Sequence, residues 1–137
     1  LAGIDRFDTP FDLVLHKQHF PKGVEPLSDD DKLALASMRE ALVRRIEGVD
    51  TVVYDTHFMP DEYAKFPHYG HSTPDQALEI CQAAKVRRLG LYHHAPSHTD
   101  EQMDKIAAEY LAKGAGVNVE VLTSFEGMTL PIGAETT

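Results

Sequence analysis

The sequence predicts an α/β domain, in which short strands alternate with helices along the chain. Apolar runs of strand length alternate with stretches in which apolar residues recur at helical spacing. The helical stretches also begin with residues that cap a helix N-terminus. A strand–helix–strand–helix–strand order needs crossover connections, so we expect some of the strands to pair in parallel.

The first predicted helix follows an irregular N-terminal segment, residues 1–27. Proline and glycine interrupt that segment, and only residues 11–16, FDLVLH, are typical of a short strand. The helix over about 29–47 has Ser28 as its cap and Gly48 at its end. Its apolar residues form the stripe that we expect to be buried, namely Leu35, Met38, Leu42 and Ile46.

A buried strand is predicted at residues 50–55, DTVVYD, followed by a long loop and a second helix. The loop, residues 56–72, is rich in aromatic residues, histidine and proline, and loops of this length in compact domains often carry function. Thr73 caps the second helix, and Gln76 is its capping-box partner. The apolar face of this helix consists of Ala77, Ile80, Cys81 and Ala84.

The remaining part of the chain predicts three more strands and one more helix. The run RRLGLYH, residues 87–93, is typical of a strand. Thr99 and Gln102 repeat the capping-box pattern for a helix over about 100–113. Two short strands are expected at 117–123 and 128–132.

Composition and charge exclude several classes of protein. The 137 residues suit one domain, and the sequence has neither an apolar tract of membrane-spanning length nor the pattern of a signal peptide. The single cysteine excludes an internal disulfide framework, and we expect a cytoplasmic protein. A net charge of -9 disfavours nucleic acid as a partner unless metal ions or a local basic patch intervene.

Three chemically versatile side chains stand where strands end or a helix begins. Asp55 ends one predicted strand, His93 ends the next, and His71 lies just before the second helix. In α/β sheets, ligands gather beyond the carboxyl ends of the strands. Neutral imidazoles bind transition metals, and a carboxylate can orient a histidine and raise its basicity. The alternative is that each of these groups is a strand-end polar residue that bonds to backbone.

The other histidines give weaker patterns. His94 and His98 lie around a turn that contains Pro96, where hydrogen bonds to backbone are the more common role. A mononuclear metal site built from His93, His94 and His98 is an alternative. The spacing LHKQH, residues 15–19, also permits a metal pair.

The segment from about 49 to 131 resembles the C-terminal half of a metallo-β-lactamase-fold hydrolase. A strand that ends in YDT, a GHST before a helix, and a strand that ends in LGLYHH before HTDEQMD carry this resemblance. It is closest to the branch of transfer-RNA 3′-processing nucleases and related phosphodiesterase-like hydrolases. It implies the second half of an αββα sandwich, with a mixed sheet and flanking helices.

The resemblance also implies a centre with two divalent metal ions, zinc by expectation and manganese or iron as alternatives. His93 takes the place of a metal ligand. His71 takes that of a proton donor or phosphate clamp, and Asp55 that of the acidic residue that supports it. The family's bridging aspartate is expected at the end of an earlier strand, where the sequence LAGID makes Asp5 the candidate.

The His-x-His-x-Asp-His motif of that family is absent from the 137 residues. Since most metal ligands would come from it, we expect the chain to hold only part of a dinuclear site. Residues 1–27 would then join a missing N-terminal half, and residues 28–137 would form the C-terminal half. The start at Leu1 favours such a fragment over a degenerate, non-catalytic binding or regulatory module.

The function implied is hydrolysis of a phosphoester or related bond, as part of a longer chain. The acidic net charge favours a small-molecule substrate over a long nucleic acid. The loop 56–72 would line the substrate pocket, with His57, His68 and Tyr69 as substrate contacts. The alternative is that these residues are surface groups that do not contact substrate. The expected partner is the missing N-terminal half, because a half-fold leaves one sheet face uncovered. A homo-oligomer is a further option.

Overall fold

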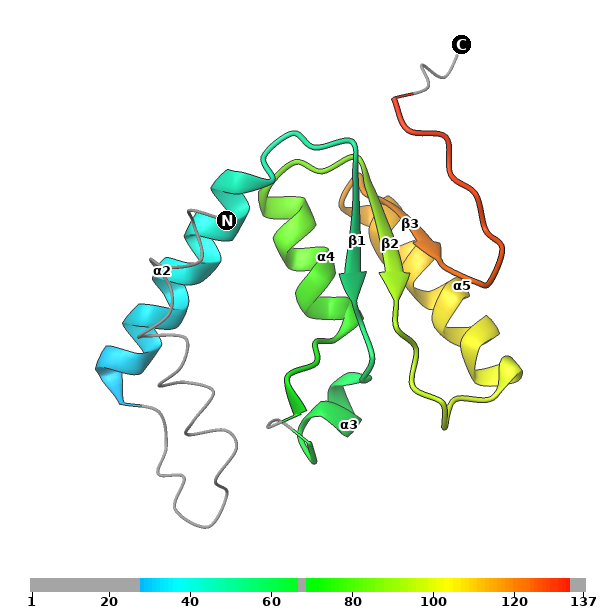
Figure 1. Ribbon diagram of the computed structural model, residues 1–137, viewed down its shortest axis with the longest axis horizontal. Coiled ribbons are helices and arrows are strands. Elements are labelled where there is room, and N and C mark those ends of the chain that lie inside the picture. The colour runs from blue at the N-terminus through cyan, green and yellow to red at the C-terminus, as the bar shows by residue number, and fades with distance from the viewer. Residues whose placement is uncertain (1–27, 67–68, 134–137) are drawn as a thin grey trace.

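A computed structural model describes residues 28–66 and 69–133 and shows helices packed against a small parallel sheet (Figure 1). The predicted FDLVLH strand therefore lies outside the described residues. The α/β class is confirmed by the order of the elements. That order is α2 (Asp29–Arg45), β1 (Thr51–Asp55), α3 (Pro60–Tyr63), α4 (Pro74–Ala83), β2 (Arg88–Tyr92), α5 (Asp100–Gly116) and β3 (Glu120–Thr123).

The three described strands form one sheet in the order β1-β2-β3, and both neighbouring pairs are parallel. The α4 and α5 crossovers account for this pairing, because each returns the chain to the same edge of the sheet. The predicted mixed pairing is therefore not found among these strands. In the register of β1 and β2, Asp55 stands opposite Tyr92, so both strands end at the same edge (Figure 1).

The helix ends follow the capping patterns of the sequence. Ser28, Thr73 and Thr99 each accept a hydrogen bond from the backbone three residues on, in a complete capping box. Each box satisfies two of the N–H groups that a helix start leaves without an intrahelical partner. The three predicted helix starts are confirmed, and α5 extends three residues beyond its predicted end.

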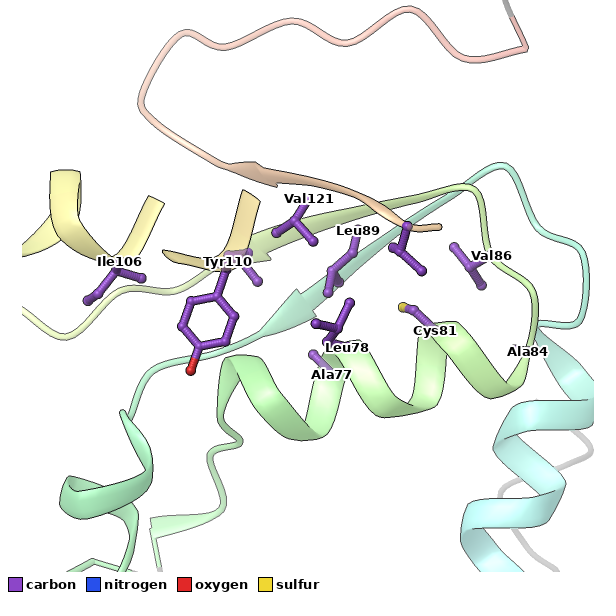
Figure 2. Packing of buried hydrophobic residues seen from close by; sticks show 11 residues of the cluster. Ala77, Leu78, Cys81, Ala84, Val86, Leu89, Ile106, Tyr110 and Val121 are labelled. Atoms are coloured by element: carbon purple, nitrogen blue, oxygen red, sulfur yellow. The ribbon is translucent and has the colours of Figure 1, made fainter. Parts of the chain in front are cut away.

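The core lies between one face of the sheet and the helices α4 and α5. Figure 2 shows Leu89 and Val121 pointing from the strands toward Leu78 and Cys81 of α4. The predicted apolar face of α4 is confirmed, since its four residues are all buried. At roughly 25 cal/mol per Å² of apolar surface removed from water, this layer is the main source of stability in the described fold.

The helices that the structure describes leave the opposite face of the sheet largely uncovered. Val53 is 60% exposed and Tyr92 is 56% exposed, with Gly90 between them in the sheet. The predicted burial of the strand at 50–55 is therefore wrong on this face. β1 is an edge strand of the described sheet, and only its alternate residues, Val52 and Tyr54, pack against the core.

The predicted strand at 128–132 does not form. Residues 128–131 have no regular secondary structure, and they run back on the side of the sheet that faces away from α4 (Figure 2). Pro131 has no N–H to contribute to a ladder. Its carbonyl instead accepts a hydrogen bond from Arg88 Nη1 at 3.0 Å, so a side chain replaces strand pairing there.

The predicted buried stripe of α2 is only half-buried. Its four residues are all of intermediate exposure, because the described contacts of this helix are chiefly with α4. Val43 and Ile46 pack against the edge of the core. No helix among the described residues is long and apolar enough to cross a membrane.

The close approach of α5 to β3 depends on Gly114. A methyl group built there would collide with the carbonyl oxygen of Val119 and with the side chain of Val121. We expect Gly114→Ala to lower the free energy of unfolding by about 1–3 kcal/mol, because the backbone must shift to admit the new atom. Urea unfolding would measure the loss. Gly116→Ala is the matched control, since a methyl group at that position meets open space.

Candidate metal centre

The candidate site lies at the edge of the sheet where β1 and β2 end. Asp55 is the last residue of β1, and His93 follows the last residue of β2. His71 lies two residues before Thr73, the N-cap of α4. The parallel register and the start of α4 thus bring together three side chains that are up to 38 positions apart in the sequence.

The carboxylate of Asp55 contacts all three neighbouring segments. Its Oδ2 atom lies 2.8 Å from His71 Nδ1 and 3.2 Å from His93 Nδ1. Its Oδ1 atom accepts a hydrogen bond of 3.2 Å from the backbone N–H of His57. The carboxylate therefore fixes the orientation of two imidazoles and the backbone that carries a third.

The three imidazoles face one another. The ring centroids of His57 and His71 are 4.4 Å apart, and each of these rings lies 4.9 Å from the ring of His93. One nitrogen from each ring comes within 4.8 Å of the other two. Among the described residues, this is the group of potential ligand side chains whose atoms lie close enough together to hold a metal ion.

The hydrogen bonds around these rings suit them to a metal ion. His57 Nδ1 donates to the carbonyl oxygen of His93 at 3.0 Å, and His71 Nδ1 donates to Asp55. With Nδ1 occupied in this way, Nε2 carries the lone pair that a metal ion requires. His93 Nδ1 also faces Asp55, with 3.2 Å to Oδ2. Such a donor set fits zinc and related divalent transition metals.

Two pKa shifts describe the electrostatics of the cluster. Partial burial lowers the pKa of His57 below its ordinary value, and the positive charge that His71 and His93 can carry lowers it further. The neutral form of His57, which binds metals, is thereby favoured. For Asp55, burial acts to raise the pKa, but hydrogen bonds from His71 and from the His57 backbone outweigh it. The pKa of Asp55 is consequently lowered.

An aromatic cluster adjoins the imidazoles. Phe58 is buried and lies edge-on to His71, with 5.7 Å between the ring centroids. Phe66 stacks on Phe58 at 5.6 Å and on Tyr69 at 5.2 Å. Tyr69, a predicted substrate contact, is exposed at the outer end of this stack. The loop therefore presents an apolar surface next to the site, as its composition indicates.

The predicted site residues differ in where the structure places them. Asp55, His71 and His93 lie together, whereas Asp5 and His68 are outside the described residues. His57, predicted as a substrate contact, is a member of the imidazole cluster itself. The only signal for that position in the sequence is its place two residues beyond a strand end, and residues there have no fixed direction.

The alternative site of His93, His94 and His98 is not formed. His94 Nε2 lies 2.9 Å from the carbonyl oxygen of Ser124, so its predicted backbone contact is present. The backbone contact predicted for His98 is wrong for its side chain, because Nε2 lies 2.8 Å from Oε1 of Glu62. Both imidazoles are thus engaged away from His93.

Comparison with known proteins finds relatives that share one name. The chain is 32% identical over 91 residues to "Ribonuclease Z" of Anoxybacillus flavithermus (strain DSM 21510 / WK1), which covers 66% of the chain and 28% of that protein. It is 29% identical over 94 residues to "Ribonuclease Z" of Geobacillus kaustophilus (strain HTA426), covering 69% and 30%. It is 39% identical over 54 residues to "Ribonuclease Z" of Sulfolobus acidocaldarius (strain ATCC 33909 / DSM 639 / JCM 8929 / NBRC 15157 / NCIMB 11770), covering 39% and 18%.

No protein-family profile matches the chain. The matched segments span less than a third of the length of these relatives. The resemblance to the transfer-RNA 3′-processing branch is nevertheless confirmed, at low identity and over part of the chain: the curated relatives are ribonuclease Z proteins, nucleases of the metallo-β-lactamase fold.

Proposed function

We propose that this chain is part of a metal-dependent hydrolase that cleaves phosphodiester bonds. The observation that carries the proposal is the cluster of His57, His71 and His93 around one carboxylate, at the carboxyl edge of a parallel sheet. The name ribonuclease Z describes enzymes that cut phosphodiester bonds, and it supports the same reaction class. Neither observation depends on the other.

His57 and His93 would hold a metal ion through Nε2, and Asp55 would orient His71 and His93. The dinuclear centre implied by the family resemblance needs further ligands, for which Asp5 and a missing N-terminal half stay the candidates. Bound divalent ions would supply hydroxide near neutral pH and stabilise negative charge on the phosphoryl oxygens. Zinc is the proposed ion, since imidazole is one of its usual ligands, with manganese or iron as alternatives.

His71 is the proposed proton donor or phosphate clamp. Its Nδ1 donates to Asp55 at 2.8 Å, which leaves Nε2 directed away from the carboxylate. When the imidazole is protonated, Nε2 carries its second N–H. A proton on Nε2 can then be donated to the oxygen of a leaving alcohol, or it can bind a phosphoryl oxygen. Asp55 remains charged in either role, because its pKa is lowered.

The uncovered sheet face supports the proposed αββα architecture. Val53 and Tyr92 present large apolar surface on the side opposite α4 and α5. In a two-sheet sandwich the second sheet packs about 10 Å away over such a face. We therefore retain the proposal that residues 28–137 are the C-terminal half of a domain whose other sheet covers Val53 and Tyr92.

The proposed substrate is a small phosphodiester. A net charge of -9 repels a long polyanion, whereas the exposed aromatic stack of Phe66 and Tyr69 suits an apolar or planar group next to the bond that is cut. RNA is the competing substrate, because the relatives are ribonucleases. Rapid cleavage of structured RNA at physiological salt, with slow cleavage of small diesters, would contradict this choice.

A non-catalytic binding or regulatory module is the second candidate. The specific observation in its favour is that the sequence has no His-x-His-x-Asp-His motif. A stretch of that kind about a hundred residues upstream in the coding sequence would favour the enzyme.

Zinc content should depend on His93 and not on its neighbour. We expect His93→Ala to remove most of the zinc that the purified chain retains after dialysis, because one of the two imidazoles proposed to bind the ion is lost. His94→Ala is the matched control, since its ring turns away to Ser124. Elemental analysis would measure both. Equal zinc contents for the two variants would exclude His93 as a ligand.

Asp55→Asn should weaken zinc binding by about 10–100-fold, the usual effect of removing a carboxylate that orients ligand histidines. The amide keeps the size of the side chain and can still accept the His57 N–H.

The stability that Asp55 contributes should depend on pH, because its pKa is lowered on folding. The folded carboxylate stabilises the protein above pH 3.8, and this contribution is lost as the pH falls through its folded pKa. The stability difference between wild type and Asp55→Asn should therefore shrink on acidification, as measured by urea unfolding. A difference in the free energy of unfolding that does not change with pH would contradict this expectation.

His71→Ala should separate catalysis from metal binding. In the longest natural chain that contains these residues, we expect kcat for bis(p-nitrophenyl) phosphate to fall by about 10²–10⁴-fold, the range for loss of a general acid. Zinc content should stay near that of the wild type. A proportional loss of zinc and activity would instead identify His71 as a metal ligand.

A further inference from the structure

Glu62 and His98 form a hydrogen-bonded pair of side chains in the segments that follow His57 and His93. His98 Nε2 lies 2.8 Å from one carboxylate oxygen of Glu62 and 3.0 Å from the other. The side chain of His98 is only 6% exposed, and that of Glu62 is 28% exposed. The imidazole of His98 is therefore shielded from water, and it would be costly to leave it there without a hydrogen-bond partner.

Both partners are fixed by the local backbone. Glu62 is the third residue of α3, and its Oε2 atom also accepts the backbone N–H of Met59 at 2.7 Å. The backbone N–H of His98 donates to the carbonyl oxygen of Ala95 at 2.9 Å, which closes a turn directly before Thr99, the N-cap of α5. The Glu62–His98 pair therefore joins two anchored positions that are 36 residues apart.

The two segments that the pair joins are those that carry two of the clustered histidines. His57 lies in the first of these segments, residues 56–62, and His93 begins the second, residues 93–98. Near the sheet edge these segments are joined by the hydrogen bond from His57 Nδ1 to the His93 carbonyl oxygen. Glu62 and His98 join them again at their far ends. The spacing of the two segments is thereby constrained at both of their ends, and with it the distance between His57 and His93.

We propose that Glu62 and His98 are positioning residues for the metal centre, which hold the segments of His57 and His93 at the spacing that metal binding needs. This inference rests on the proposed function, because it assumes that the imidazole cluster binds metal. A site whose ligands are already in place binds metal more tightly than one that must order them. Neither side chain touches the metal in this role.

The test measures zinc affinity and fold stability in the same variants. Zinc Kd is determined for the 137-residue chain by competition with a chromophoric chelator, and urea unfolding is followed without metal. We expect His98→Ala to raise Kd by about tenfold, at the low end of the effect of residues that orient metal ligands. His98→Gln should recover most of that affinity, because its amide N–H can still donate to Glu62.

Val86→Ala is the control for a purely structural effect. Val86 is buried in the core two residues before β2 begins, at the opposite end of the sheet from the histidines. The Val86→Ala substitution should lower the free energy of unfolding but leave the zinc Kd unchanged. The Co²⁺ absorption spectrum gives a second readout, because a change in ligand spacing in His98→Ala alters it and a loss of core packing in Val86→Ala does not.

The outcomes separate the two proposals. If wild type binds zinc and His98→Ala binds it equally well, the positioning role is overturned while the metal centre stands. The positioning role is also overturned if Val86→Ala loses as much zinc affinity as His98→Ala. If wild type binds no more zinc than His93→Ala, both proposals fall.

Discussion

The carboxylate of Asp55 is the group on which the arrangement of the candidate metal centre depends. It contacts the imidazoles of His71 and His93 through one oxygen and the backbone of His57 through the other. These segments share no local structure, and the pKa of His57 is lowered by burial and, to a smaller extent, by the charge that the neighbouring imidazoles can carry. The parallel register of β1 and β2 delivers the carboxylate to the point where all three segments meet.

Local sequence signals predict the helices well, because a capping box and an apolar face are completed within a few residues of each other. Ser28, Thr73 and Thr99 illustrate this. The apolar run at 50–55 predicts a buried strand. Its burial depends instead on what covers each face of the sheet, and Val53 lies on the face that the described helices leave uncovered. The unpaired segment 128–132 is a similar case, since pairing depends on a distant edge.

Site residues are predictable only where the fold class fixes their place. Asp55 and His93 follow strands, and residues at strand ends of an α/β sheet gather at one edge. His57 lies two residues farther on, and its ring direction comes from its bond to the His93 carbonyl oxygen, a contact 36 positions away. The turn that holds His98 is predictable, but its partner Glu62 belongs to a short helix within the segment that the sequence predicts as a loop.

The backbone of His93 explains how two neighbouring strands present their side chains to one point. Asp55 is on the face of the sheet away from α4 and α5, together with its partner Tyr92. Continued strand alternation would turn the next residue, His93, toward the opposite face. Its φ of 63° breaks the alternation and brings its ring to Asp55. A side chain other than glycine adopts this left-handed conformation at a cost of about 1–2 kcal/mol. The contacts of His93 with His57 and Asp55 offset that cost, so the same bonds that order the cluster also maintain the strained turn that forms it.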